Sequence, residues 1–257
     1  MRQIDVFVPG NYKSIFILPI GDVHFGSKNY NEKYINQVRR FIDKNKNRTR
    51  IILMGDLLEN ATKSSVGRGV YDENYHTWSQ FKKAVSTFYP YRNIIDLIIE
   101  GNHEERIIRD TSFEIVEELS HRLGRPDAYG KITGLINYIM PSGIVYSVFA
   151  WHGATGGTKE SSAINGLLSM RERALAHIYL MGHTHKLLSF SREMVIPDPG
   201  SKKPNIIEQL FINTGTAVSY VGYGEQKGYP LTKAGFGVIQ VFNDERKQVF
   251  HRIEDII

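Results

Sequence analysis

The first half of the chain alternates short apolar runs with longer amphipathic segments. Short continuous apolar runs are typical of buried strands, whereas apolar residues three or four positions apart are typical of helices. The alternation therefore predicts β-α-β units on a largely parallel sheet. The predicted strands of this half are Ile15–Ile20, Ile51–Met54 and Ile94–Ile99, and the predicted helices are Tyr34–Asp43, His76–Phe88 and Ser112–Leu123.

The second half has a different pattern, in which turn-rich segments separate short strand-like runs. No linker composition, internal repeat or low-complexity tract divides the chain, so we expect a single α/β domain with two sheets over residues 1–257. The predicted elements here are the strands Leu135–Met140, Val145–Ala150, Ile178–Met181, Leu187–Ile196, Ile206–Ile212, Phe236–Phe242 and Gln248–Ile253, and the helix Ser161–Ala174.

Composition narrows the chemistry that this fold can carry. The chain has no cysteine, which excludes disulfide frameworks, thiolate zinc sites, iron–sulfur clusters and cysteine nucleophiles. No leader-like segment and no apolar run of roughly 18 residues is present, so we expect a cytoplasmic protein without a membrane partner. The net charge of +5 is compatible with a polyanionic partner and does not require one.

Polar residues of one kind follow the predicted strands. Five of the nine histidines come just after a strand, usually with a glycine beside them. Ligands in α/β proteins bind beyond the carboxyl ends of the strands, so we expect these segments to meet at one place. They are Gly21-Asp22-Val23-His24, Gly55-Asp56, Gly101-Asn102-His103-Glu104, Trp151-His152-Gly153 and Gly182-His183-Thr184-His185.

The side chains that gather there are oxygen and nitrogen ligands without sulfur, which suit Mn²⁺, Fe, Zn²⁺ or Mg²⁺. One ion takes about three or four protein ligands, so seven candidates indicate two ions. A pair of ions can activate a water molecule and hold an anionic ester for in-line attack. The pattern therefore predicts phosphoester hydrolysis.

As an ordered set, these segments resemble the five successive motifs of the calcineurin-like metallophosphoesterase superfamily. The resemblance implies a four-layer α-β-β-α sandwich of two mixed sheets flanked by helices. It also implies two divalent ions, most often Mn²⁺, with Fe, Zn²⁺, Mg²⁺ or Ni²⁺ as alternatives, and His103 as the general acid that protonates the leaving oxygen or steadies the phosphate. The implied ligands are Asp22, His24 and His185 for the first ion, Asn102, His152 and His183 for the second, and Asp56 as the bridge between them.

The positions at which this sequence departs from the motifs indicate which branch of the superfamily it resembles most. Protein Ser/Thr phosphatases have phosphate-binding arginines where this chain has Asn60 and Glu100, which argues against that class. The run from Asp22 to Gly26 is closer to the Asp-x-His-x-Gly of the Mre11/SbcD type of DNA repair nuclease, although we do not expect the DNA-binding cap of those enzymes here. A branch that hydrolyses a lipid-linked sugar nucleotide ranks third, because it has arginine at the position of His103.

We therefore expect a phosphodiester substrate, in DNA, RNA or nucleotides. The alternatives are a phosphomonoesterase, a nucleotide pyrophosphatase of the same fold, or a non-catalytic scaffold. Basic and aromatic residues near the motifs are candidate substrate contacts, because stacking and phosphate neutralisation together hold single strands. They are Arg68 and Tyr71 in an insertion after the second motif, Tyr223 in a Gly-rich loop, and Lys186, with Arg106, Arg109 and Lys159 beside the motifs.

Overall fold

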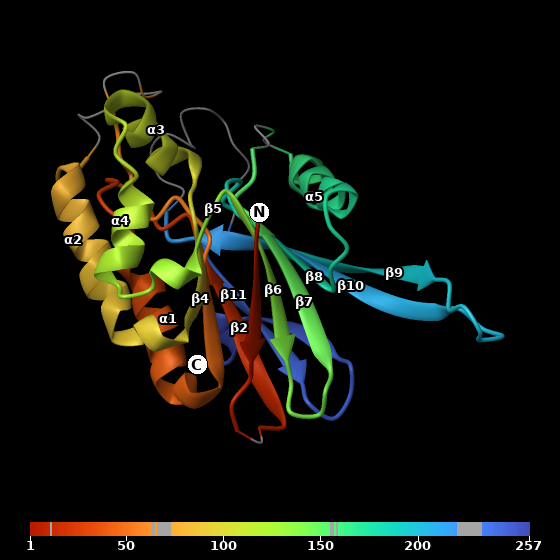
Figure 1. The fold of residues 1–257 in the computed structure, drawn as a ribbon. Helices are drawn as coiled ribbons and strands as arrows, with labels where there is room; N and C mark the ends of the chain where they lie inside the picture. The colour runs from red at the N-terminus through yellow and green to blue at the C-terminus, as the bar shows by residue number, and fades with distance from the viewer. Residues whose placement is uncertain (11, 63–64, 66–72, 155–156, 158, 220–232) are drawn as a thin grey trace.

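The computed structural model describes residues 1–10, 12–62, 65, 73–154, 157, 159–219 and 233–257 (Figure 1). Its strands form two sheets that face each other. The order in one sheet is β1 (Arg2–Phe7), β6 (Thr133–Ile139), β7 (Val145–Trp151), β8 (Ile178–Met181), β10 (Asn205–Thr216) and β9 (Leu187–Ile196). The order in the other sheet is β12 (Gln248–Arg252), β11 (Gly235–Phe242), β2 (Ser14–Ile20), β3 (Thr49–Leu53), β4 (Ile95–Ile99) and β5 (Tyr129–Lys131).

Both sheets are mixed. Strands β2 to β5 run parallel to one another, as do β7, β8 and β10, whereas the β6–β7, β9–β10 and β11–β12 pairs are antiparallel. The two sheets share hydrogen bonds at one corner, where the end of β10 pairs with the start of β11 through Gly215–Phe236 and Thr216–Gly235. This corner makes the hydrogen-bonded network continuous through both sheets.

Helices cover the outer faces of the two sheets (Figure 1). One apolar cluster fills the space between the sheets, a second lies under the helices that cover β2 to β4, and a third lies under α5. The protein therefore has four layers, α-β-β-α, and the predicted fold class is confirmed. The helices on the first face are α1 (Glu32–Asn45), α2 (Thr77–Phe88) and α4 (Ile115–Arg122), and the helix on the second is α5 (Glu160–Ser169). Helix α3 (Asn102–Thr111) lies above α4, at the end of the sandwich (Figure 1).

Local sequence explains α1 well. The Asn31 side chain accepts a hydrogen bond from the Lys33 amide at 3.0 Å and caps the helix. Its buried residues, Ile35, Val38 and Phe41 with Ile42, recur at helical spacing and pack on the sheet. The predicted helix is two residues short at each end, since the polar terminal turns carry no apolar signal.

Three elements were missed, and a fourth was predicted to begin too early. The predicted helix Ser112–Leu123 is α4, which begins only at Ile115, and a separate helix, α3, precedes it. The two are separated at Ser112, which has a left-handed φ of 59°. Helix α3 was not predicted, because its only buried residue is Glu104 and it therefore has no apolar face. The strands β1 and β5 were also missed, because β1 is a mostly exposed edge strand and β5 has only three residues.

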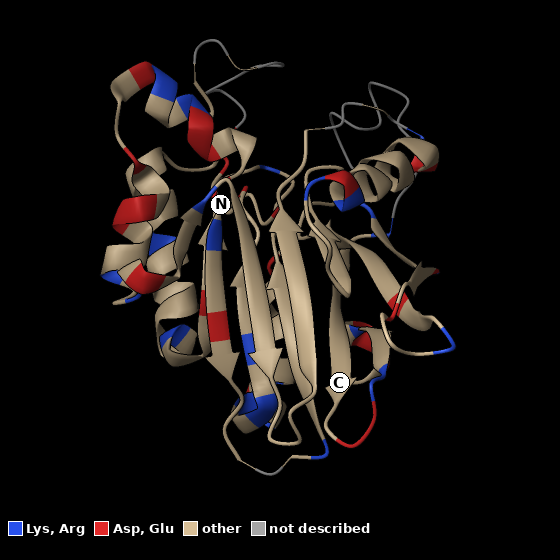
Figure 2. Cartoon of the chain, turned by 45° about the vertical axis from the view of Figure 1, so that its right-hand side comes forward, with Lys and Arg blue, Asp and Glu red and all other residues tan. Residues whose placement is uncertain are grey.

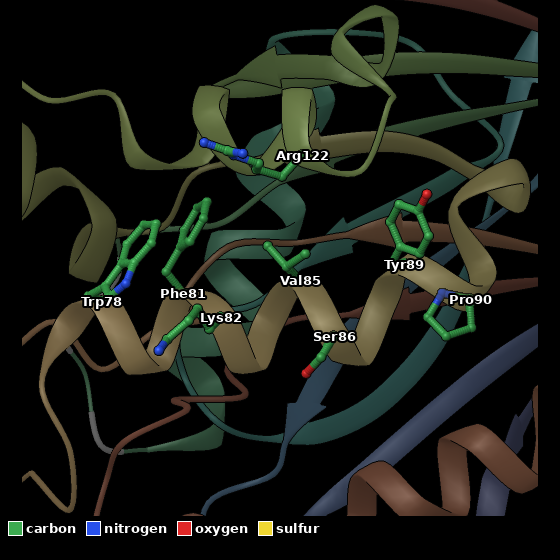
Figure 3. Close-up of a pocket in the computed structure, with 8 residues that line it drawn as sticks. All are labelled: Trp78, Phe81, Lys82, Val85, Ser86, Tyr89, Pro90 and Arg122. Carbon is green, nitrogen blue, oxygen red and sulfur yellow. The ribbon is translucent and has the colours of Figure 1, made fainter.

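Charged residues lie mainly on the helices and loops, with acidic and basic residues interspersed (Figure 2). No helix within the described residues is long and apolar enough to cross a membrane. A groove of about 440 Å³ runs along α2, where Trp78, Val85 and Tyr89 face Arg122 of α4 (Figure 3). None of the predicted site residues that the structure describes lines this groove.

Candidate metal centre

The five predicted segments meet beyond the strand ends of both sheets. Backbone hydrogen bonds join the loops that follow β2 and β3, from Asp22 N to Gly55 O and from His24 N to Asp56 O, both at 3.0 Å. A bond of 3.0 Å from Gly182 N to His152 O joins the loops after β7 and β8 in the same way. The His183 amide also donates to Asp22 Oδ1 at 3.1 Å, so segments 161 residues apart in the chain hold one another in place.

Asp22, His24 and His185 form a first group, whose candidate ligand atoms all lie within 4.8 Å of one another. The Nε2 atoms of the two histidines are 3.0 Å apart, and His185 Nε2 lies 3.3 Å from Asp22 Oδ1. Asp22 is fully buried and His24 nearly so, which leaves His185 as the most accessible member. These are the three residues predicted for the first ion.

Asp56, His152 and His183 form a second group within the same 4.8 Å limit. The Oδ1 atom of Asn102 joins them, at 2.7 Å from His183 Nδ1 and 3.2 Å from His152 Nε2. Asp56 Oδ2 lies 3.3 Å from His152 Nε2 and 3.8 Å from His24 Nε2. Asp56 thus stands between the two groups, where a bridging carboxylate has to be.

The donor set fits divalent cations. The Nδ1 atom of His152 lies 2.7 Å from the Met54 carbonyl, so Nδ1 must carry a proton and Nε2 is left to face Asp56 and Asn102. Glu59 Oε2 lies 3.0 Å from His24 Nδ1 and directs His24 Nε2 to the first group in the same manner. These two histidines are thereby held with one ring nitrogen directed at the centre, as a metal requires.

Most of the candidate ligands have an unusual backbone. A left-handed conformation is uncommon outside glycine, costs on the order of 1–3 kcal/mol, and clusters at functional sites. Here it aims successive side chains of short loops at one point. The left-handed candidates are Asp22, His24, Asp56, His183 and His185, with φ between 48° and 67°.

Two glycines of the motifs are required by close approach. A Cβ atom at Gly101 would collide with the Asp56 carboxylate, and one at Gly182 would lie 2.7 Å from Asp22 Oδ2. The absence of a side chain at these positions lets two strand-exit loops touch through the carboxylates of the centre.

Burial and neighbouring charges set the ionisation of the ion-free centre. Burial opposes the charge on Asp56, but the charges of His152 and His103 outweigh it and hold the pKa of Asp56 well below its usual range. Burial likewise opposes the charge on His152, yet the nearby Asp56 raises the pKa of His152 to about 10. Binding a cation here therefore has to displace a proton from an imidazole, so metal affinity should rise with pH.

His103 belongs to neither of these two groups, but with His24 and Glu59 it forms a third set whose candidate ligand atoms lie within 4.8 Å of one another. Its Nδ1 atom is 2.6 Å from the Glu59 carbonyl, its amide donates to Asp56 Oδ1 at 2.8 Å, and its Nε2 atom lies 3.8 Å from Asp56 Oδ2. Burial lowers the pKa of His103 to about 4, so the imidazole is neutral at pH 7 in the ion-free protein. Its role as general acid stays a prediction.

Two supporting residues were missed by the sequence analysis. Glu59, read there only as a departure from a phosphatase motif, is the hydrogen-bond partner of His24. Glu104 is fully buried and accepts three backbone amides, from Gly101 at 2.9 Å, Asp56 at 2.8 Å and Leu58 at 3.0 Å. A glutamate three residues after a helix N-cap is a recognisable capping signal, which could have identified both Glu104 and the start of α3.

The predicted substrate contacts are placed less completely. Arg68, Tyr71 and Tyr223 lie outside the described residues. Lys186 is buried and donates a hydrogen bond of 2.7 Å to the Lys159 carbonyl at the start of α5. That these four residues contact the substrate stays a prediction.

The two positions that argued against a Ser/Thr phosphatase are both buried. Neither amide atom of Asn60 has a hydrogen-bond partner within the described part of the chain. Glu100 is hydrogen-bonded to the Tyr129 hydroxyl, and burial raises the pKa of Glu100 to about 7. Neither position supplies a cation to the centre.

No protein-family model matches the sequence, and no curated protein matches it at a significant level. Solved structures do match. A metallophosphoesterase from Sphaerobacter thermophilus is 15% identical, with 93% of this chain and 88% of that chain covered and a TM-score of 0.40. The calcineurin-like phosphoesterase YfkN from Bacillus subtilis is 11% identical, with 94% and 91% covered and a TM-score of 0.37. The zinc complex of Vps29 from Entamoeba histolytica is 17% identical, with 93% and 99% covered and a TM-score of 0.39.

Two of these three neighbours are named as phosphoesterases, and one of them as calcineurin-like, the superfamily that the motifs resemble. None of the three is named as a nuclease of the Mre11/SbcD type. That finer assignment stays a prediction.

Proposed function

We propose that the protein is a dinuclear metal-dependent phosphoesterase that hydrolyses phosphodiester bonds. The observation that carries the proposal is the pair of adjoining groups, Asp22 with His24 and His185, and Asp56 with His152 and His183. Two adjoining sets of three ligands, with Asp56 Oδ2 of the second set 3.8 Å from His24 Nε2 of the first, are more than a single structural cation needs. Their buried oxygen and nitrogen atoms are the donors that hydrolytic metal pairs use.

The residues of each group would hold one ion, with Asn102 in the second group and Asp56 between the two. When bound, such ions lower the pKa of a water molecule and neutralise the charge of a phosphate. Mn²⁺ is the first choice to test, and Fe, Zn²⁺, Mg²⁺ and Ni²⁺ are the others. The chain itself keeps the donor atoms in position through the hydrogen bonds of His24 to Glu59 and of His152 to Met54 O.

His103 is the residue for proton transfer in this proposal. Its Nδ1–H is engaged by the Glu59 carbonyl, so the ring presents Nε2 toward Asp56. When Nε2 carries a proton as well, an imidazole held in this way can donate that proton to the oxygen of the departing alcohol.

Nucleic acid and nucleotides are the proposed substrates. The basic net charge and the departures from the phosphatase motifs at Asn60 and Glu100 support a diester over a protein phosphomonoester. Duplex DNA, single-stranded DNA, RNA and mononucleotides should be compared at two salt concentrations. Binding through lysine and arginine weakens steeply as salt rises, so a polynucleotide substrate predicts a strong salt dependence of KM.

Chelation and metal replacement test the proposal as a whole. Treatment with a chelator should abolish hydrolysis of bis(p-nitrophenyl) phosphate, and added Mn²⁺ should restore it. Added Mn²⁺ should also raise Tm, because an ion that binds only the folded state stabilises it. Activity that is indifferent to the chelator would overturn the proposal. Full metal occupancy without turnover of any mono- or diester would favour the non-catalytic scaffold.

A further inference from the structure

Arg106 places a cation beside the proposed proton-transfer residue. It lies one turn beyond His103 on α3, with Nη1 3.1 Å from His103 Nδ1 and Nη2 2.9 Å from His103 Nε2. The guanidinium is half-buried, next to the imidazole. We propose that Arg106 binds a non-bridging oxygen of the phosphodiester that the centre hydrolyses, on its His103 side, an inference that rests on the proposed function.

The contact with His103 leaves most of the guanidinium donors available. His103 Nδ1 lies 2.6 Å from the Glu59 carbonyl, and it can bond to that oxygen only as an N–H. A protonated Nδ1 cannot accept from Nη1, so only the contact at Nε2 is a hydrogen bond. Arginine has five donors, and a phosphate can therefore bind Arg106 without first breaking an ion pair.

Two other partly buried arginines are paired with carboxylates. Arg50 is bound to Asp96, and Arg125 lies 3.0 Å from Asp127. Within the described residues, no carboxylate lies within 4.0 Å of the Arg106 guanidinium. The Glu59 carboxylate is instead hydrogen-bonded to His24 Nδ1 at 3.0 Å.

The charge of the centre explains why a phosphate needs such a residue. Asp22, Asp56 and Glu59 place three carboxylates around the point where the substrate has to arrive, and the first two are fully buried. With two divalent ions bound, Asp22 and Asp56 are neutralised, and Glu59, with Oε1 3.8 Å from His103 Nδ1, is the carboxylate that a phosphodiester approaching from the His103 side still meets. Arginine suits this task because its planar fork matches the oxygens of a phosphate and stays charged at every relevant pH.

Isothermal calorimetry with inorganic phosphate, in the presence of Mn²⁺, tests the contact without turnover. Arg106→Ala should weaken phosphate binding about 10- to 100-fold, the range for loss of a charged hydrogen bond. Arg106→Lys keeps the charge and should lose less of the affinity for phosphate. The matched control is Arg122→Ala, which removes an exposed arginine of α4 that is paired with Glu118 and should bind phosphate as the wild type does.

Kinetics on bis(p-nitrophenyl) phosphate separate a substrate contact from a structural role. Arg106→Ala should raise KM, and millimolar guanidinium should partly restore it, which would not happen if the variant were only destabilised. Wild-type phosphate affinity and KM in Arg106→Ala would overturn the inference. Phosphate binding that depends on Arg106 in a wild type without diester hydrolysis would support the contact and overturn the proposed function.

Discussion

At the scale of single residues, the centre divides into side chains that would bind ions and side chains that orient them. Asp22, Asp56 and the histidines around them offer ligand atoms directly. Glu59 acts through His24, and its hydrogen bond decides which ring nitrogen faces the centre. The two kinds of residue predict different effects of substitution.

Asp56→Asn and His103→Ala should separate binding from chemistry. Asp56 stands between the two ligand groups, so its replacement should lower both metal content and rate, the rate by at least about 100-fold. His103→Ala should lower the rate by about 100- to 10,000-fold with both ions retained, as expected for loss of a proton-transfer group. Metal analysis beside kcat measures both, and an empty site in His103→Ala would mean that its assigned role is wrong.

Glu59→Gln tests the orienting role. The amide keeps the size of the side chain but loses the charge that favours a proton on His24 Nδ1, so metal affinity should fall about 10- to 100-fold. Glu105→Gln, an exposed neighbour of the site on α3, is the matched control. Titration with Mn²⁺ measures the affinity, and equal affinities for the two variants would contradict the role of Glu59.

At the scale of elements, α3 connects the loops that follow β3 and β4. Burial raises the pKa of Glu104, and the nearby Asp56 adds to the shift. The three amides that Glu104 accepts come from both loops, which explains why a helix without an apolar face is nevertheless fixed in place.

Glu104→Ala should therefore destabilise the protein strongly. Each buried amide that loses its partner costs about 1–3 kcal/mol, and three amides lose theirs. Glu104→Gln keeps one acceptor oxygen, so its free energy of unfolding should fall by less. Urea unfolding monitored by circular dichroism gives the free energies, and a Glu104→Ala variant as stable as wild type would show that water satisfies these amides.

At the scale of the whole molecule, His177 joins elements at the end of the sandwich away from the centre. Its Nδ1 atom lies 3.0 Å from the Ser147 amide on β7, and Arg246 before β12 lies 2.8 Å from its Nε2. Burial, with a contribution from the Arg246 charge, lowers the pKa of His177 to about 4. The folded state therefore keeps this histidine neutral.

Stability should fall as the pH drops through the window that this shift opens. In the unfolded state His177 takes up a proton below about pH 6.5, whereas in the folded state it does so only below about pH 4. Acid therefore favours unfolding between these two values. At pH 5, His177 lowers the free energy of unfolding by about 1 kcal/mol, once the screening of a half-exposed group is allowed for. His177→Gln should lose less stability than wild type between pH 7 and pH 5 in urea unfolding, and identical losses would refute the assignment.

Much of the fold could be predicted from the sequence because its signals are local. The apolar runs identified β2, β3, β4 and β8 to within two residues at each end, since those strands are buried on both faces. The strands β1 and β5 gave no such signal, because edge strands and three-residue strands bury few side chains. Helix α3 was missed because a polar contact rather than an apolar face holds it.

For the candidate site, the sequence by itself determined which residues come together. Each candidate ligand directly follows a strand, and the ends of packed strands meet at one edge of the sandwich. Only the tertiary structure decided how they divide into two groups around Asp56, which way the imidazoles of His24 and His152 face, and that Glu59 and Glu104 join them. Arg106 was already a candidate contact from the sequence, and the structure places it 2.9 Å from His103 Nε2. Those features depend on left-handed loop conformations and on hydrogen bonds between distant segments, and neither is encoded in the spacing of residues along the chain.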